Sequence, residues 1–292
     1  MLVVLAGVFF VPNLTGIDPA EATLRARFSD PNPDPVALSS LRSEFGLDQH
    51  VAGRMLNFAG RAIRGDFGLS YVSRLPAWPP AVRAFGVSLT LVLITMALAV
   101  GLGCVCGVVA ASSKRGFGRA ARTVCILGSS FPPHVLGPLC VLVFGVWLRV
   151  LPTGGWEGWR SAVLPVIVLM IGPLATIGEV VRSEMVEALR ASFVRTARAK
   201  GLSNARVLIH AFAVSRHGAI ALSGVMLTGL LSGAVLVETL FSLPGIGRML
   251  VDGVRNSDVP VVQATLTLAV GFSLIISTLM DIGTRYADPR IR

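Results

Sequence analysis

The chain has 292 residues, of which 53% are hydrophobic and 14% are charged, and it carries a formal net charge of +10. Soluble domains carry about 25% charged residues, so this composition excludes an ordinary water-soluble protein and indicates an integral membrane protein. Its apolar runs are continuous and do not alternate over ten-residue segments, so they predict membrane-spanning helices and not barrel strands.

The first twelve residues, "MLVVLAGVFFVP", are apolar but shorter than the roughly 20 residues that a membrane helix needs. They lack the charged flank and the small-residue cleavage site of a signal peptide. We therefore interpret residues 1–12 as the remnant of a first transmembrane helix.

Residues 13–83 are predicted to form an external segment, which the proline-rich stretches "DPNPDP" and "LPAWPP" interrupt. Between these stretches, residues 36–45 and 51–64 have the pattern of short amphipathic helices, and Gly46 is placed to end the first of them. The segment is either a spacer or a lip that docks an external partner.

Five uncharged runs of membrane-spanning length follow, at residues 84–111, 123–148, 161–178, 218–237 and 259–280. Together with the first twelve residues they predict an all-α membrane protein of about six transmembrane helices. Residues 84–292 then form one transmembrane core.

The run at residues 123–148 contains three prolines, so its helix is predicted to be kinked or broken. Broken helices occur at membrane depth only where they are buried in protein or line a water-filled cavity. His134, next to Pro132 and Pro133, is the only ionisable residue inside a predicted span. These three residues either line a pathway, or the histidine satisfies a carbonyl that the kink frees.

Basic and neutral loops alternate along the chain. The basic loops are residues 112–122, with Lys114 and Arg115 among their cations, residues 182–217, and the tail at residues 285–292. Positive loops stay on the cytoplasmic side of a membrane, so we expect a multi-pass protein of the bacterial cytoplasmic membrane with a cytoplasmic C-terminus. This distribution accounts for the basic charge without a nucleic-acid partner.

Two glycine pairs, Gly103/Gly107 and Gly229/Gly233, have the four-residue spacing that lets membrane helices approach closely. All four cysteines lie inside predicted spans. They form neither a disulfide framework nor a CxxC metal site, so no bound metal is expected.

The basic loop at residues 182–217 has the pattern of a folded helix–turn–helix. Residues 182–200 form an amphipathic helix with one apolar stripe (Met185, Leu189 and Phe193). Gly201 stands where a residue with positive φ ends such a helix, and Ser203 is placed to cap a second short helix over residues 204–212.

Three interpretations of this loop compete. A DNA-binding helix-turn-helix has similar charge, but both ends of the loop are tied to the membrane and a supporting third helix is missing. An amphipathic helix on anionic lipid is the second. An element that inserts into a cytoplasmic partner explains the rigid fold, the slim apex and the charged rim together.

The sequence of this loop, "FVRTARAKGLS" at Phe193–Ser203, resembles the signature of permease subunits of ATP-binding-cassette (ABC) importers. Four further motifs resemble the dipeptide, oligopeptide and nickel branch of that family: "FGLD", "GDFGLS", "ETLFSLPGIG" and "DPRIR". They occur in the expected order and extend over essentially the whole chain.

The resemblance implies the type I ABC importer permease fold and a coupling loop that meets an ATPase subunit. It assigns that role to Arg195, Thr196, Ala197, Arg198, Ala199, Lys200, Gly201, Leu202 and Ser203. It also implies a second homologous permease, two cytoplasmic ATPases and an external binding protein that delivers peptide. The chain itself is then no enzyme and binds no cofactor, because ATP and Mg²⁺ belong to the partner ATPases.

Other functions stay open at this point. The same machinery imports nickel or another small solute such as haem. A self-contained secondary transporter needs carboxylates inside the membrane, yet Glu179 and Asp281 lie only at span ends. A membrane hydrolase needs a nucleophile–base pair or a metal cluster, and a single intramembrane histidine does not supply one.

Overall fold

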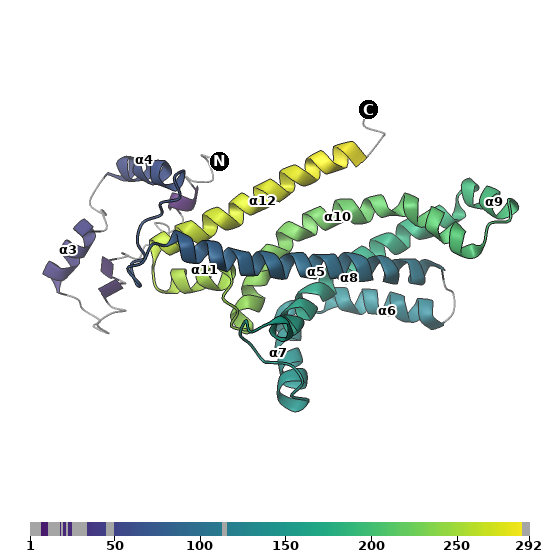
Figure 1. Cartoon of the computed structure of the whole chain (residues 1–292), viewed down its shortest axis with the longest axis horizontal. Helices are drawn as coiled ribbons and strands as arrows, with labels where there is room; N and C mark the ends of the chain where they lie inside the picture. The colour runs from purple at the N-terminus through teal and green to yellow at the C-terminus, as the bar shows by residue number, and fades with distance from the viewer. Residues whose placement is uncertain are drawn as a thin grey trace. The chain divides into compact units, whose positions relative to one another are not determined.

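The computed structural model describes residues 34–44, 50–112 and 116–287, together with residues 7–10, 18, 20–21 and 23–24 of the N-terminal part. Within these residues the secondary structure is helical, apart from an isolated bridge between Leu69 and Pro76. Figure 1 shows the helices in chain order: α3 (Pro35–Glu44), α4 (Val51–Ala62), α5 (Trp78–Ser112), α6 (Gly116–Ser130), α7 (Pro133–Cys140), η2 (Val141–Trp147), α8 (Trp159–Arg190), α9 (Ser192–Ala199), α10 (Asn204–Leu240), α11 (Ile246–Arg255) and α12 (Val259–Ala287).

The chain divides into two compact units. Unit 1 comprises residues 1–88 and 244–274, and unit 2 comprises residues 89–243 and 275–292. Helices α5 and α12 each continue from one unit into the other. The predicted boundary between an external segment and a transmembrane core at residue 83 is not tested by this division.

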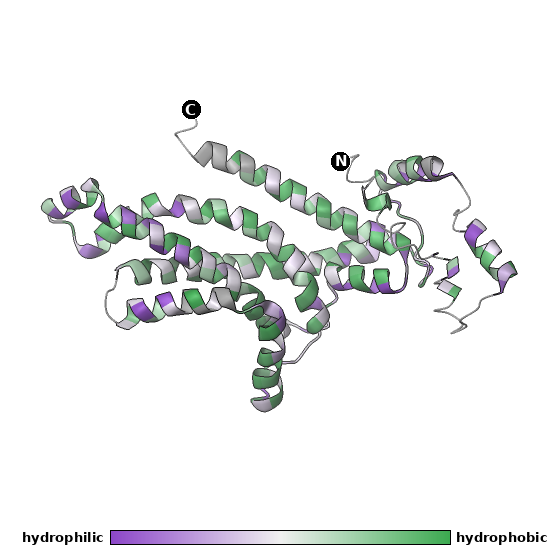
Figure 2. Ribbon diagram, turned by 180° about the vertical axis from the view of Figure 1, so that it is seen from behind, coloured by the Kyte–Doolittle hydropathy of each residue, from purple (hydrophilic) through white to green (hydrophobic). Residues whose placement is uncertain are grey.

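Among the described residues, four helical segments are long and apolar enough to cross a membrane: Trp78–Ser112, Trp159–Arg190, Gly218–Leu240 and Val259–Met280. They coincide with four of the predicted spans, and Figure 2 shows their predominantly hydrophobic residues. Most of the predicted first span, residues 1–12, lies outside the described residues. Of it, residues 7–10 are helical.

The break predicted for the run at residues 123–148 is confirmed. Helix α6 ends at Ser130, and α7 starts at Pro133, where proline is tolerated because a first-turn N–H has no partner inside the helix. Helix α7 then continues as the seven-residue π-helix η2. Residues 133–147 form one shorter apolar helix.

Unit 2 is built around α8. Gly103 and Gly107 of α5 lie against it so closely that a Cβ on Gly107 would meet the Gly178 carbonyl oxygen at 2.6 Å. Helices α6 and α10 also pack on α8. The predicted close approach is therefore confirmed for Gly103/Gly107. It is not found for Gly229, because no described atom lies within 4 Å of the position of its Cβ.

The far end of α10 meets the residues that precede α8. Glu238 is fully buried there, and the Gly155 N–H donates to the Phe241 carbonyl at 2.9 Å. A Cβ on Gly154 would lie 2.6 Å from the same carbonyl oxygen. This close backbone contact fixes the corner in which α10 ends.

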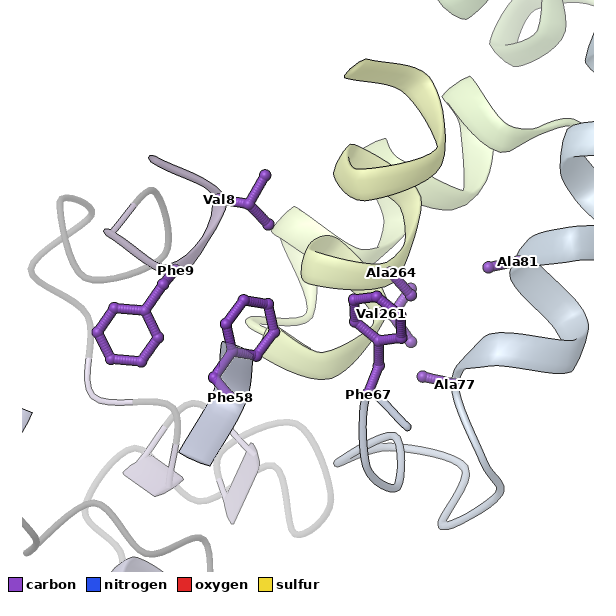
Figure 3. Packing of buried hydrophobic residues seen from close by; sticks show 8 residues of the cluster. All are labelled: Val8, Phe9, Phe58, Phe67, Ala77, Ala81, Val261 and Ala264. Atoms are coloured by element: carbon purple, nitrogen blue, oxygen red, sulfur yellow. The ribbon is translucent and has the colours of Figure 1, made fainter. Parts of the chain in front are cut away.

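The core of unit 1 is an aromatic cluster formed by segments far apart in sequence. Figure 3 shows Phe9, Phe58 and Phe67 beside small residues of α5 and α12. The Phe67 ring stacks on Trp78, with 4.9 Å between the ring centroids. Aromatic pairs of this kind stabilise beyond the area that they bury, so the cluster holds the segment before α5 against the start of α12.

Candidate functional site: the exposed turn between α8 and α10

The predicted helix at residues 182–200 is wrong as one continuous helix. Helix α8 ends at Arg190, Ala191 has an extended backbone (ψ 157°), and α9 starts at Ser192. Val194, on the first turn of α9, is fully buried, whereas Phe193 is exposed. The apolar stripe expected from Met185 to Phe193 is thus interrupted, because the break turns Val194 toward the protein in place of Phe193.

The turn that follows α9 has the predicted geometry. Gly201 has φ +77°, a conformation that is easy for glycine and strained for other residues. Its N–H donates to the Arg198 carbonyl at 2.9 Å, and the Leu202 N–H donates to the Ala197 carbonyl at 3.2 Å. These two bonds form a Schellman motif, which satisfies carbonyls that the helix end leaves open.

Helix α10 begins at Asn204, as predicted from Ser203, and the Val207 N–H donates to the Ser203 carbonyl at 3.0 Å. The Ser203 side chain forms no capping hydrogen bond. The expected short helix at residues 204–212 is wrong, because α10 continues to Leu240 and contains both this helix and the following span. No proline lies between Asn204 and Leu240 to end the helix earlier.

The nine predicted coupling residues lie together on one protruding element (Figure 1). Seven of them are exposed: Arg195, Thr196, Arg198, Ala199, Lys200, Gly201 and Ser203. Ala197 and Leu202 are half-buried. Helix α9 contacts both α8 and α10, and buried Val194 and Val207 anchor the element from its two sides. Packing therefore holds the turn while its polar side chains stay accessible.

A groove of about 510 Å³ runs between α9 and α10. Apolar Phe193, Leu202 and Val214 line it together with Lys200 and His210. The element thus has an apolar groove on one side and a cationic apex, formed by Arg195, Arg198 and Lys200, that is exposed.

The predicted pathway residues lie elsewhere in unit 2, at the break between α6 and α7. His134 and Pro132 are exposed and Pro133 is half-buried. The His134 side chain makes no hydrogen bond or ion pair within the part of the chain that the structure describes. Nothing in these contacts decides whether it faces a pathway, so this role stays a prediction.

A buried polar contact in unit 1 was not predicted. The Asp258 carboxylate, just before α12, accepts a short hydrogen bond from the Ser70 hydroxyl and one of 3.1 Å from the Tyr71 N–H. Both Ser70 and Asp258 are buried. The signal was present in "GDFGLS", which ends at Ser70, but nothing in that motif names its partner 188 residues away.

A second buried contact fixes α11. The Ser88 hydroxyl of α5 accepts a hydrogen bond of 2.8 Å from the Ile246 N–H, at the first residue of α11. It thereby satisfies one of the N–H groups that a helix start leaves without a partner. Among the described residues, no group of three or more His, Cys, Asp or Glu side chains is arranged to hold a metal ion.

Three comparisons relate the chain to known proteins. A family model described as "Binding-protein-dependent transport system inner membrane component" matches residues 99–292. The chain is 34% identical over 285 residues to the glutathione transport system permease protein GsiC of Escherichia coli strain K12, covering 97% of this chain and 91% of that protein. It is 34% identical over 272 residues to the dipeptide transport system permease protein DppB of Lactococcus lactis, covering 91% and 88%.

Two solved structures share the fold. One is the MetNI methionine ABC transporter in an inward-facing conformation, with a TM-score of 0.57 and 16% identity, covering 71% of this chain and 95% of that one. The other is an amino acid ABC transporter crystallised with histidines, with a TM-score of 0.57 and 15% identity, covering 71% and 94%.

Proposed function

Because the chain belongs to the family of binding-protein-dependent transport system inner-membrane components, we propose that it is the transmembrane subunit of an ABC importer for di- and oligopeptides. It pairs with a second homologous permease to form the substrate pathway. Two cytoplasmic ATPases bind ATP and Mg²⁺, and an external binding protein delivers the cargo. The chain itself supplies no catalytic group.

The cargo class rests on the relatives. The two named above are a glutathione permease and a dipeptide permease, and each aligns with nearly the whole chain. Peptides are therefore favoured over nickel or haem. Mass spectrometry of the small molecules that co-purify with the binding protein tests this choice, and a bound metal complex in place of a peptide would contradict it.

The exposed turn is proposed to couple ATP hydrolysis to transport. In this proposal α9 and Gly201 sit in a groove on the surface of an ATPase subunit. Closure of the ATPase dimer displaces that groove, and α8 and α10 carry the displacement to the membrane spans. The observation that supports this role most strongly is the Gly201 turn. Its backbone is fixed by two hydrogen bonds, yet no described atom lies within 4 Å of the position of a Cβ on Gly201.

The experiment uses this geometry. In Gly201→Val the added Cβ meets no described neighbour within 4 Å, so we expect the effect to arise from left-handed strain, about 1–2 kcal/mol, and from bulk at the apex. We expect the permease pair to assemble, ATPase co-purification to fall, and uptake by reconstituted complexes to be lost. Gly201→Asn is the matched control, because asparagine tolerates positive φ, and it should retain more ATPase. Normal transport by Gly201→Val would contradict the coupling role.

We further propose that Arg198 and the C-terminus are cytoplasmic and that Ser40 and Arg255 are external, because the basic loops alternate with neutral ones. The predicted cytoplasmic Lys114 lies outside the described residues. In a cysteine-free background, single cysteines at positions 40 and 255 should react with a membrane-impermeant maleimide in intact cells. Reaction at position 198 from outside would reverse the orientation.

The break at Pro132, Pro133 and His134 is proposed to line the pathway. His134 lies on the first turn of α7 with its side chain exposed, where a second permease subunit and the cargo would meet it. His134→Ala should lower the rate of peptide uptake without changing assembly. An unchanged rate and unchanged peptide selectivity would assign the residue to the lipid-facing or purely structural surface.

A further inference from the structure

A cleft of about 550 Å³ lies within unit 1, between the first turns of α5 and helix α11. Arg83 lines it from α5, and Arg248 and Asp252 line it from α11. Asn256 and Asp258, which follow α11, complete its polar lining. The proposed coupling residues all lie in unit 2, so this cleft is a separate feature of the chain.

One charged side chain of the cleft, that of Arg83, has no partner among the described residues. Asp252 pairs with Arg248 on the same helix, with 3.7 Å between its carboxylate and the guanidinium Nε. The Asp258 carboxylate accepts the hydrogen bonds from Ser70 and Tyr71. Arg83 is exposed and makes no ion pair or hydrogen bond within the residues that the structure describes. The group left for a ligand is therefore a guanidinium, which binds carboxylates through paired hydrogen bonds.

The surface beside the cleft is apolar although it lies outside the candidate spans. Leu69, Val72 and Leu75, in the turn before α5, are 53%, 46% and 61% exposed, and Val72 lines the cleft itself. An exposed apolar side chain that shares a cleft with an arginine, as Val72 does with Arg83, is typical of protein–protein interfaces. The composition favours a protein partner over a free ion.

The walls of the cleft are fixed before any partner arrives. Asp258 ties the turn at Ser70 to the start of α12, and Ser88 ties α5 to the start of α11. Ala77, Ala81 and Val261 belong to the aromatic cluster, which packs these elements together (Figure 3). A site on rigid elements loses little conformational entropy on binding, which suits repeated and transient docking.

We propose that this cleft receives an aspartate or glutamate side chain of the external binding protein, with Arg83 as its partner. The inference rests on the proposed function and extends it, because it assigns the docking contact to particular residues. A free peptide is the less suitable occupant. Its ammonium group needs an available carboxylate, but Asp258 is buried and already accepts two hydrogen bonds, and Asp252 lies 3.7 Å from the Arg248 guanidinium.

The test measures the affinity of the substrate-binding protein encoded with this permease for the complete importer in lipid nanodiscs, by biolayer interferometry. Arg83→Glu should weaken binding about tenfold or more, because it removes an interface arginine and places a carboxylate opposite the carboxylate of the partner. Arg83→Lys keeps the charge but loses the paired hydrogen bonds of the guanidinium, so it should weaken binding by less than Arg83→Glu does. High salt should reduce the difference between these variants.

Arg255→Glu is the matched control, because Arg255 is an exposed arginine on the last turn of α11 that does not line the cleft. It should bind within about twofold of the unchanged protein, since an exposed charge outside the cleft contributes little. Co-purification of the ATPases verifies that each variant assembles.

Unchanged affinity of Arg83→Glu overturns the proposal, and so does an equal loss in Arg255→Glu. Direct binding of a labelled peptide that depends on Arg83, with unchanged docking of the binding protein, overturns it in favour of a cargo site. If the unchanged importer binds no binding protein at all, the proposed function itself fails, which is a distinguishable result.

Discussion

Two turns of this protein, one in each unit, are built on glycines with nearly the same backbone angle but are held in different ways. Gly68, in the turn before α5, has φ +83°, and Gly201, after α9, has φ +77°. The Gly68 turn is fastened by a buried carboxylate from a distant segment, Asp258. The Gly201 turn is fastened by its own backbone bonds and by apolar packing at Val194 and Val207.

The difference shows how a turn becomes fixed or accessible. A buried hydrogen-bonded carboxylate determines the position of the Gly68 turn, because leaving its partners unsatisfied costs free energy. At the Gly201 turn no polar side chain of residues 195–203 is buried, so these groups are available to another subunit. The Gly68 turn stabilises the fold, whereas the Gly201 turn exposes polar side chains to other subunits.

The largest expected effect on stability is that of Asp258→Ala. It leaves the Ser70 hydroxyl and the Tyr71 N–H without their buried acceptor, which should lower the free energy of unfolding by about 1–3 kcal/mol. Thermal unfolding in detergent and protease cleavage near residue 70 measure it. Asp252→Ala is the control, because its exposed ion pair is worth less than about 1 kcal/mol. Equal losses in the two variants would contradict the anchoring role.

Alanine substitutions at the two glycines separate the roles of the two turns. Both Gly68→Ala and Gly201→Ala introduce about 1–2 kcal/mol of left-handed strain, and neither added Cβ comes closer than 3.9 Å to a described neighbour. We expect both variants to lose a similar amount of thermal stability, because the strain is the same. Only Gly201→Ala should also reduce ATPase co-purification. The reverse pattern would refute the division of roles.

A charge reversal at the exposed turn should have a smaller effect. Arg198→Glu places an acid in the last turn of α9, where the helix dipole favours a cation. We expect ATPase affinity to fall about threefold, mainly through slower association, and the loss to shrink at high salt. Arg64→Glu, an exposed arginine of unit 1, serves as control and should leave ATPase affinity unchanged.

The smallest effect concerns the phenol beside the buried carboxylate. Burial, with the nearby Asp258 charge adding to it, raises the pKa of Tyr71 to about 12 from an ordinary 10.0. The folded-state pKa of Tyr71 is higher than the unfolded-state value, so the protonated phenol contributes to stability. This contribution is complete below pH 10.0 and is lost as the pH rises toward 12. Absorbance at 295 nm, compared between the unchanged protein and Tyr71→Phe, should show ionisation of this residue only in that upper range.

Local patterns predicted much of this architecture. The family resemblance at residues 193–203 is confirmed, as are four spans and the positive φ of Gly201. Each of these could be predicted because it depends on residues that are neighbours in the sequence. The break at Ala191 was missed since no proline or glycine marks it and burial of Val194 accompanies it. The Ser70–Asp258 contact was missed because its two residues meet only through tertiary structure.

The length of helix α10 affects how far its exposed end can move. Its 37 residues contain no proline and span about 55 Å at 1.5 Å per residue. One end is immobilised where Phe241 meets Gly154 and Gly155, while the other carries the exposed turn. Rotated as a rigid rod about this buried corner, the helix would move the exposed turn furthest. A tilt of only about 5° shifts the tip by roughly 5 Å, so a displacement of several ångströms at the turn requires only a slight rotation at Glu238.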